Sequence, residues 1–120
     1  MKHNAGFEKL VAEAKGRVKE TNCQEVMQRM EKGEKLNLVD VREDNEWSKG
    51  HLPGAKHLGK GVIERDIESL HPDKTEPLYL YCGGGFRSAL AADNLQKMGY
   101  TNVYSVDGGW RALKDLLPTE

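Results

Sequence analysis

The sequence predicts an α/β fold of three layers, with a mostly parallel central sheet of about five strands flanked by helices. Short apolar runs typical of buried strands alternate along the chain with segments of helical periodicity. Right-handed crossovers would bring such strands into one parallel sheet. The length of 120 residues suits a single domain, which is large enough to bury roughly two-thirds of its unfolded surface.

The first predicted element is an amphipathic helix over residues 5–15, which ends at Gly16. Its apolar face contains Phe7, Leu10, Val11 and Ala14. We expect residues 1–17 to form a helical extension that packs outside the main domain, residues 18–120, and no chemistry requires this helix.

A short edge strand over residues 18–20 comes next, and Thr21 and Gln24 then match a capping box. The helix that it opens ends near Gly33. Its apolar positions are Val26, Met27 and Met30.

In the middle of the chain, residues 36–41 are a mostly apolar run typical of a buried strand. A helical turn over 43–48 and a turn-rich segment lead to a minimal strand at 56–58. Residues 61–70 then have helical spacing. The inner positions of that helix are Val62, Ile63, Ile67 and Leu70.

The last part of the chain begins with a central strand over residues 78–81 and a helix over 88–98 that Gly99 ends. The apolar stripe of this helix is Ala91, Leu95 and Met98. A strand over 103–106 and a helix over 110–117 complete the pattern. Sites of parallel sheets lie beyond the carboxyl ends of the strands, where the strand 78–81 delivers a cysteine.

The loop after that strand carries the strongest functional signal. Its residues are Cys82, Gly83, Gly84, Gly85, Phe86, Arg87 and Ser88. Three glycines let the backbone curl so that consecutive N–H groups point inward and form a nest for an anion. A helix that begins at the arginine or the serine adds its free N–H groups and its positive dipole end. Because the thiolate is the reactive form of cysteine, the loop predicts a cysteine nucleophile that faces an anionic substrate.

Composition excludes several other classes of function. The chain has 19 acidic and 18 basic residues, so no overall field favours nucleic acid or a membrane surface. Two cysteines in different predicted elements do not form a disulfide framework and suit a reducing cytoplasm. No apolar stretch approaches a membrane span, and the polar start does not resemble a secretion signal. We therefore expect a cytoplasmic monomer that binds neither nucleic acid nor membrane.

From residue 18 to about residue 117 the chain resembles a rhodanese domain. Three ordered segments carry the resemblance. The first runs from Leu38 to Arg42 and continues through Glu46-Trp47 to residues 50–55, the second is the cysteine loop, and the third is residues 108–110.

The resemblance implies a sulfurtransferase that carries sulfane sulfur on Cys82 as a persulfide and needs no metal or organic cofactor. Its donor would be a small anion such as thiosulfate or a protein persulfide, and its acceptor cyanide or a thiol. The loop from Cys82 to Arg87 has six residues, whereas related phosphatases and arsenate reductases have one more. A phosphatase or arsenate reductase is therefore the weaker alternative. A sulfur carrier, which would use the same persulfide as the enzyme, and an interaction module are the non-enzymatic alternatives.

Several side chains have expected roles around this loop. Arg87 would hold the anionic oxygens of the donor, because its planar fork suits them, and Phe86 is the one bulky group before it. By resemblance, Asp40 would hydrogen-bond the loop and Arg42 would pair with an acid such as Glu46.

Other residues with reactive or bulky side chains are assigned to the structure and not to catalysis. These are Cys23, His51, His57, Lys60, Trp47 and Trp110.

Overall fold

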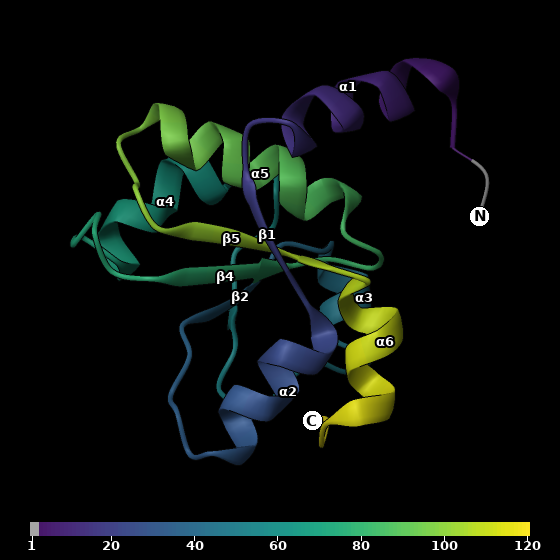
Figure 1. Ribbon diagram of the computed structural model, residues 1–120, viewed down its shortest axis with the longest axis vertical. Helices are drawn as coiled ribbons and strands as arrows, with labels where there is room; N and C mark the ends of the chain where they lie inside the picture. Colours follow the sequence, from purple (N-terminus) through teal and green to yellow (C-terminus); the bar gives the residue numbers. More distant parts are fainter. Residues whose placement is uncertain (1–2) are drawn as a thin grey trace.

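The computed structural model describes residues 3–120. Its centre is a five-stranded sheet in the order β1-β5-β4-β2-β3, and each pair of neighbouring strands is parallel (Figure 1). The strands are β1 (Lys19–Asn22), β2 (Leu38–Asp40), β3 (Lys56–His57), β4 (Leu78–Tyr81) and β5 (Val103–Asp107). The α/β prediction is confirmed, and the sheet is wholly parallel where a mostly parallel one was expected.

Helices cover both faces of this sheet. They are α1 (Ala5–Lys15), α2 (Cys23–Glu31), α3 (Asp44–Trp47), α4 (Ile63–Leu70), α5 (Phe86–Lys97) and α6 (Gly109–Leu116). Figure 1 shows α4 and α5 on one face, with α1 beyond α5, and α2 and α6 on the other face. This is the three-layer arrangement that the alternation of strands and helices predicts.

Two apolar cores separate the layers. On one face, Val39 and Leu80 of the sheet pack with Ile67 of α4 and Leu95 of α5. On the other face, the core includes Leu38, Tyr79, Val26 and Leu113. Alternate residues of β2 thus point to opposite faces, as the pleat of a strand requires.

Helix α1 packs against α5 and is tied to the domain. Val11 and Ala14 are buried against Leu90. Arg17, just after α1, donates two hydrogen bonds to the carboxylate of Asp93, from Nε at 3.1 Å and from Nη2 at 2.8 Å. The expected appendage is therefore a docked element, while the division of the chain at residues 17 and 18 stays a prediction.

Three of the predicted inner positions were wrong. Leu10, Val62 and Leu70 are 52%, 36% and 42% exposed. Leu10 is exposed because α1 packs mainly against one neighbouring helix, so its buried stripe is narrow. Val62 precedes the first turn of α4 and Leu70 is its last residue, so neither lies on the continuous inner face.

The helix caps differ slightly from the prediction. Asn22 caps α2, and its side chain accepts a hydrogen bond from the backbone N–H of Glu25 at 2.9 Å. Thr21 instead donates its hydroxyl to the Glu25 carboxylate at 2.9 Å. Helix α5 begins at Phe86, earlier than expected, because Gly85 adopts a left-handed conformation with φ of +105° and starts the helix directly after the loop.

Candidate active site

The cysteine lies where the sequence places it, at the carboxyl end of β4 and ahead of α5. Its Sγ accepts hydrogen bonds from the backbone N–H groups of Gly85 at 3.1 Å and Ser88 at 3.4 Å. The Ser88 hydroxyl lies 3.5 Å from the same sulfur and is held at 2.8 Å by the hydroxyl of Ser105 on β5. Cys82 is only 1% exposed. Two backbone amides thus point at the sulfur, as in an anion nest.

The loop carbonyls face the other way, toward the start of α6. The backbone N–H of Trp110 donates to the carbonyl of Cys82 at 2.7 Å, and that of Arg111 donates to the carbonyl of Gly83 at 3.1 Å. The N–H and the C=O of a peptide point in opposite directions. Hydrogen bonds from the start of α6 to these carbonyls therefore help to hold the loop in its curled conformation. The segment at residues 108–110 is therefore a support of the cysteine loop.

Gly109 is required at this contact. Its φ is +51°, and a Cβ there would overlap the carbonyl oxygen of Cys82 and lie 3.0 Å from that of Gly83. Only a glycine lets the two backbones approach so closely.

Arg87 is bound by a carboxylate in this structure. Its guanidinium donates to Glu46 of α3 through Nη1 at 2.7 Å and Nη2 at 3.1 Å. These bonds lower the pKa of Glu46 from its usual 4.5 to about 2, and the same partner raises the pKa of Arg87. The expected role of Arg87 in holding anionic oxygens stays a prediction, and it requires the arginine to share its donors between substrate and Glu46.

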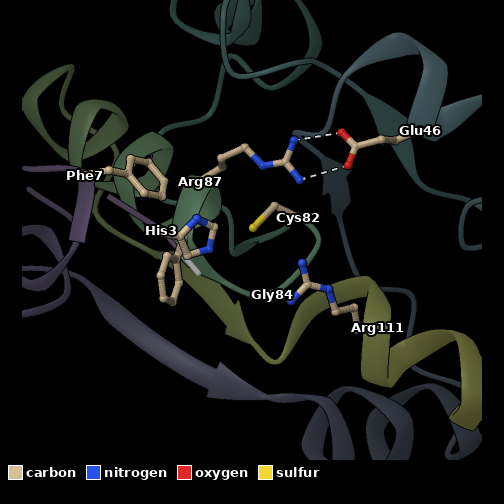
Figure 2. A pocket seen from close by; sticks show the side chains of 8 residues that line it. His3, Phe7, Glu46, Cys82, Gly84, Arg87 and Arg111 are labelled. Atoms are coloured by element: carbon tan, nitrogen blue, oxygen red, sulfur yellow. Dashed lines mark hydrogen bonds and ion pairs between the residues drawn. The ribbon is translucent and has the colours of Figure 1, made fainter. Parts of the chain in front are cut away.

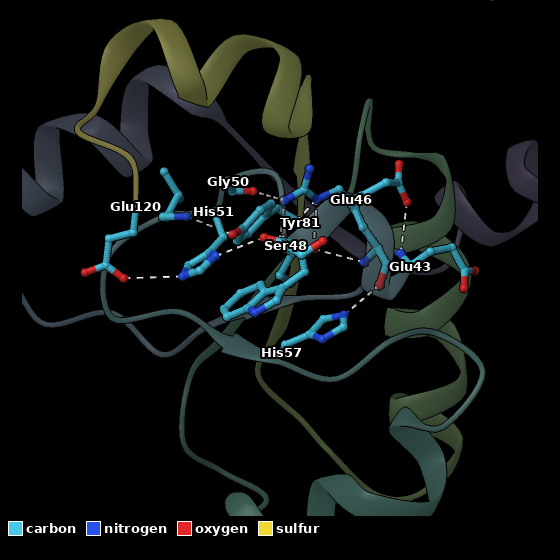
Figure 3. Close-up of polar contacts among 12 residues, drawn as sticks. Glu43, Glu46, Ser48, Gly50, His51, His57, Tyr81 and Glu120 are labelled. Carbon is cyan, nitrogen blue, oxygen red and sulfur yellow. Dashed lines mark hydrogen bonds and ion pairs between the residues drawn. The ribbon is translucent and has the colours of Figure 1, made fainter.

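Arg42 pairs with a nearby acid, as expected, but the acid differs from the one named. Arg42 pairs with Asp40, not with Glu46: Nη2 lies 2.7 Å from Oδ2, and the two side chains are 3% and 0% exposed. The carboxylate of Asp40 thus accepts hydrogen bonds from Arg42, whereas a hydrogen bond to the cysteine loop was expected. Arg42 also donates to the carbonyl of Gly50 at 2.7 Å (Figure 3). Because residues 42 and 50 flank α3, this pair holds the helix that carries Glu46.

The two histidines of this region are engaged in packing. The His51 ring stacks on Trp47 at 3.5 Å between centroids, and the His57 ring lies 4.9 Å from the same indole. His57 Nε2 contacts the carbonyl of Arg42 at 2.8 Å, and His51 Nε2 lies 3.3 Å from the Glu120 carboxylate. Trp110 packs on Arg42, whose guanidinium carbon lies 4.5 Å from the indole. These contacts agree with the structural roles that the sequence analysis gives these side chains.

The second cysteine is also buried, behind the start of α6. Cys23 Sγ donates to the carbonyls of Asp107 at 3.2 Å and Gly109 at 3.5 Å, and burial raises the pKa of its thiol. A protonated, hydrogen-bonded thiol is a structural group. Within residues 3–120, no cluster of three or more histidine, cysteine, aspartate or glutamate side chains is placed to hold a metal ion.

A pocket of about 420 Å³ opens in front of Cys82 (Figure 2). It is lined by His3, Phe7, Glu46, Cys82, Gly84, Phe86, Arg87 and Arg111. The loop residues of this set were expected from the sequence, whereas Glu46 was expected only as a partner of Arg42, and His3, Phe7 and Arg111 were missed as lining groups. Arg111 follows the 108–110 segment directly, which was a usable signal, whereas the first two reach the site only through the docking of α1.

The fold and this pocket define a parallel α/β protein with a cysteine loop between a strand and a helix. The family model of the rhodanese-like domain matches residues 22–116. The chain therefore belongs to the rhodanese-like family, as the three sequence segments indicated.

Curated relatives carry both enzyme and carrier names. The uncharacterized protein YqhL of Bacillus subtilis is 39% identical over 64% of this chain and 60% of its own length. The putative sulfur carrier protein YrkF of Bacillus subtilis is 33% identical over 78% of this chain and 50% of its own length. The thiosulfate sulfurtransferase GlpE of Ectopseudomonas mendocina is 34% identical over 69% of this chain and 74% of its own length. The match thus spans 60% of the first protein and half of the second.

Solved structures give the same family. A rhodanese-like domain protein of Staphylococcus aureus has a TM-score of 0.73 at 30% identity, with coverage of 80% of this chain and 91% of that chain. RPA3614 of Rhodopseudomonas palustris, described as a protein of unknown function and possible tyrosine phosphatase, has a TM-score of 0.86 at 27% identity. That likeness covers 100% of this chain and 98% of the other, so it includes α1. Among the described residues, no helix is both long and apolar enough to cross a membrane.

Proposed function

We propose that this protein is a sulfurtransferase that accepts a sulfane sulfur on Cys82 and passes it to a thiophilic acceptor. The observation that carries the proposal is the pair of amides, Gly85 and Ser88, directed at a sulfur that faces a pocket. Such donors favour negative charge on the cysteine and on a sulfur attached to it. The six-residue loop and the sulfurtransferase relatives support the same chemistry.

In the first step, the Cys82 thiolate attacks the outer sulfur of thiosulfate. A new S–S bond forms to Sγ, the S–S bond of thiosulfate breaks, and sulfite leaves with the electron pair. The cysteine then carries a persulfide with one negative charge, so charge and atoms balance. The loop amides stabilise this charge without a metal or an organic cofactor.

In the second step, cyanide or a thiolate attacks the outer persulfide sulfur. The S–S bond to Sγ breaks, thiocyanate or a new persulfide leaves, and the cysteine thiolate is regenerated. Transfer through one covalent intermediate predicts ping-pong kinetics. A carrier role, as the name of YrkF suggests for that protein, would use the same intermediate with a protein donor and acceptor.

The test is mass spectrometry of the intact protein after exposure to thiosulfate. We expect one added sulfur atom on the wild type and on Cys23→Ser, none on Cys82→Ser, and loss of the added sulfur when cyanide is supplied. Cys23→Ser is the matched control because Cys23 is buried but lies outside the pocket lining. An unmodified wild type, or thiocyanate formation that survives in Cys82→Ser, contradicts the proposal.

Two assays separate the neighbouring functions. Transfer rates from thiosulfate and from a persulfidated protein distinguish a free enzyme from a carrier. Hydrolysis of an aryl phosphate tests the phosphatase activity that the description of RPA3614 suggests for that protein. We expect no hydrolysis, because the six-residue loop is one residue shorter than the phosphatase loops that it resembles.

We also propose that the protein is a monomer and lies in the cytoplasm. The formal net charge of −1 gives no reason for association with a polyanion, and both cysteines are free thiols, which suits a reducing compartment. Light scattering of the reduced protein tests the oligomeric state, and fractionation of cells tests the compartment.

A further inference from the structure

The N-terminal segment supplies one side of the pocket in front of Cys82. The His3 ring lies 4.6 Å from the Phe86 ring and 5.1 Å from the Phe7 ring, and the two phenylalanine rings are 6.0 Å apart. We call these three rings the aromatic wall. Figure 2 shows His3 and Phe7 on the side of the pocket away from Glu46. The wall joins residues 3 and 7 to a residue of the cysteine loop.

The aromatic wall is held in place by the docking of α1. Val11 and Ala14 bury the inner face of this helix, and the Arg17–Asp93 pair fixes its end. Lys15 Nζ lies 5.1 Å from the centroid of Phe86 and adds a cation–π contact to that ring. A side of the pocket with three anchored rings offers a surface on which a flat apolar group can stack.

The opposite side of the pocket offers positive charge. The charges of Glu46 and Arg87 compensate each other in their ion pair. Arg111 is exposed at the edge of the pocket, and its Nη1 lies 3.4 Å from the position of a Cβ on Gly84. No ion pair involves Arg111 in the part of the chain from residue 3 to 120. Its planar guanidinium is therefore available to a carboxylate of a bound molecule.

The size of the pocket suits an organic molecule. Its volume of about 420 Å³ lies within the range of about 300 to 1,000 Å³ that is usual for organic ligands. Thiosulfate, with two sulfurs and three oxygens, would leave most of the aromatic wall without a contact.

We propose that this pocket takes a thiol that carries both an aromatic ring and a carboxylate as its preferred sulfur acceptor, with Phe7 and His3 as stacking residues and Arg111 as the carboxylate-binding residue. The proposal rests on the sulfurtransferase function and names its acceptor class. The acceptor thiolate attacks the outer sulfur of the Cys82 persulfide, and the S–S bond to Sγ breaks. The cysteine leaves as a thiolate and the acceptor becomes a persulfide, so one negative charge stays on each partner.

A matched set of acceptors tests the proposal. The full chain is loaded with thiosulfate, freed from excess donor and mixed with 3-(mercaptomethyl)benzoate, with 3-(mercaptomethyl)benzyl alcohol or with 3-mercaptopropionate. The first two differ in the carboxylate, and the first and third differ in the ring. We expect the benzoate to remove the sulfur about fivefold to tenfold faster than either of the others at limiting concentration.

Variants assign the preference to residues. Arg111→Gln should reduce the ratio of benzoate to alcohol rates about fivefold, while Lys114→Gln, an exposed cation on the same helix, keeps the wild-type ratio. Phe7→Ala should reduce the ratio of benzoate to mercaptopropionate rates about fivefold, while Leu10→Ala, at an exposed position of α1, keeps it. His3→Ala repeats the Phe7 test at a position outside any helix, where the fold is not at risk.

Each outcome decides the matter. If the wild type transfers sulfur to all three thiols at equal rates, or if Arg111→Gln and His3→Ala both keep the wild-type ratios, the acceptor class is wrong. The sulfurtransferase function stands in that case, because loading with thiosulfate and discharge by cyanide are measured in the same samples. A protein that never loads sulfur refutes the function itself.

Discussion

Replacing Gly109 with alanine tests how the cysteine loop is held. The substitution places a Cβ against the carbonyl oxygen of Cys82 and 2.9 Å from the carbonyl carbon of Gly83, both backbone atoms that cannot turn away. We expect α6 to move back from the loop. The two hydrogen bonds from Trp110 and Arg111 to the loop carbonyls would weaken with that movement.

The magnitude follows from three contributions. An alanine in the left-handed region costs about 1–2 kcal/mol, crowding of a packed contact costs about 1–3 kcal/mol, and each weakened hydrogen bond costs up to about 1.5 kcal/mol. We expect Gly109→Ala to lower the free energy of unfolding by about 3–5 kcal/mol. Gly33→Ala is the matched control, since Gly33 has φ of +85° and open space around its Cβ position. It should lose only about 1–2 kcal/mol.

Urea unfolding measures both variants, and mass spectrometry of sulfur loading on Cys82 gives the functional readout. Gly109→Ala should also load sulfur more slowly under conditions where it is folded, because its loop amides are less well directed. Equal losses of stability in the two variants would refute the reasoning. Equal losses would mean that the left-handed backbone conformation alone, and not the contact with the loop, accounts for the need for glycine at position 109.

Two further predictions concern the charges around the site. Glu46→Gln should load sulfur from thiosulfate faster than the wild type, since it frees Arg87 for the anionic donor. In urea unfolding, this variant should lose less stability than the wild type between about pH 4.5 and pH 2. The sign follows because the folded pKa of Glu46, about 2, lies below its usual 4.5, so its contribution is complete above pH 4.5 and disappears as the pH falls. Solvent screening limits that contribution to about 1 kcal/mol. Asp40→Asn should lower the free energy of unfolding by about 3–5 kcal/mol because it leaves the buried Arg42 without its partner. Asp66→Asn, in an exposed and solvent-screened pair, should leave the free energy of unfolding nearly unchanged in the same urea titration, and equal losses at positions 40 and 66 would contradict this account.

Local patterns were sufficient for most of the fold. The strand 78–81 and the helix 5–15 were predicted with the bounds that the structure has, because apolar runs and helical spacing depend on near neighbours. The errors lie at element ends. Thr21 and Asn22 both suit a cap, and only the path of the chain after β1 decides that Asn22 caps α2. Leu10 is exposed because burial depends on a partner element that the local pattern does not describe.

Sequence alone placed the cysteine loop at the centre of the site, after β4 and before α5. Three glycines after a cysteine at the end of a strand allow the backbone to curl, and the structure directs the amides of Gly85 and Ser88 at the sulfur of that cysteine. Tertiary structure decided what surrounds that sulfur. Arg87 meets Glu46, and the N-terminal segment brings its rings to the pocket, since each contact depends on how separate elements pack in three dimensions. Such contacts join residues far apart in the chain, and no local spacing records them.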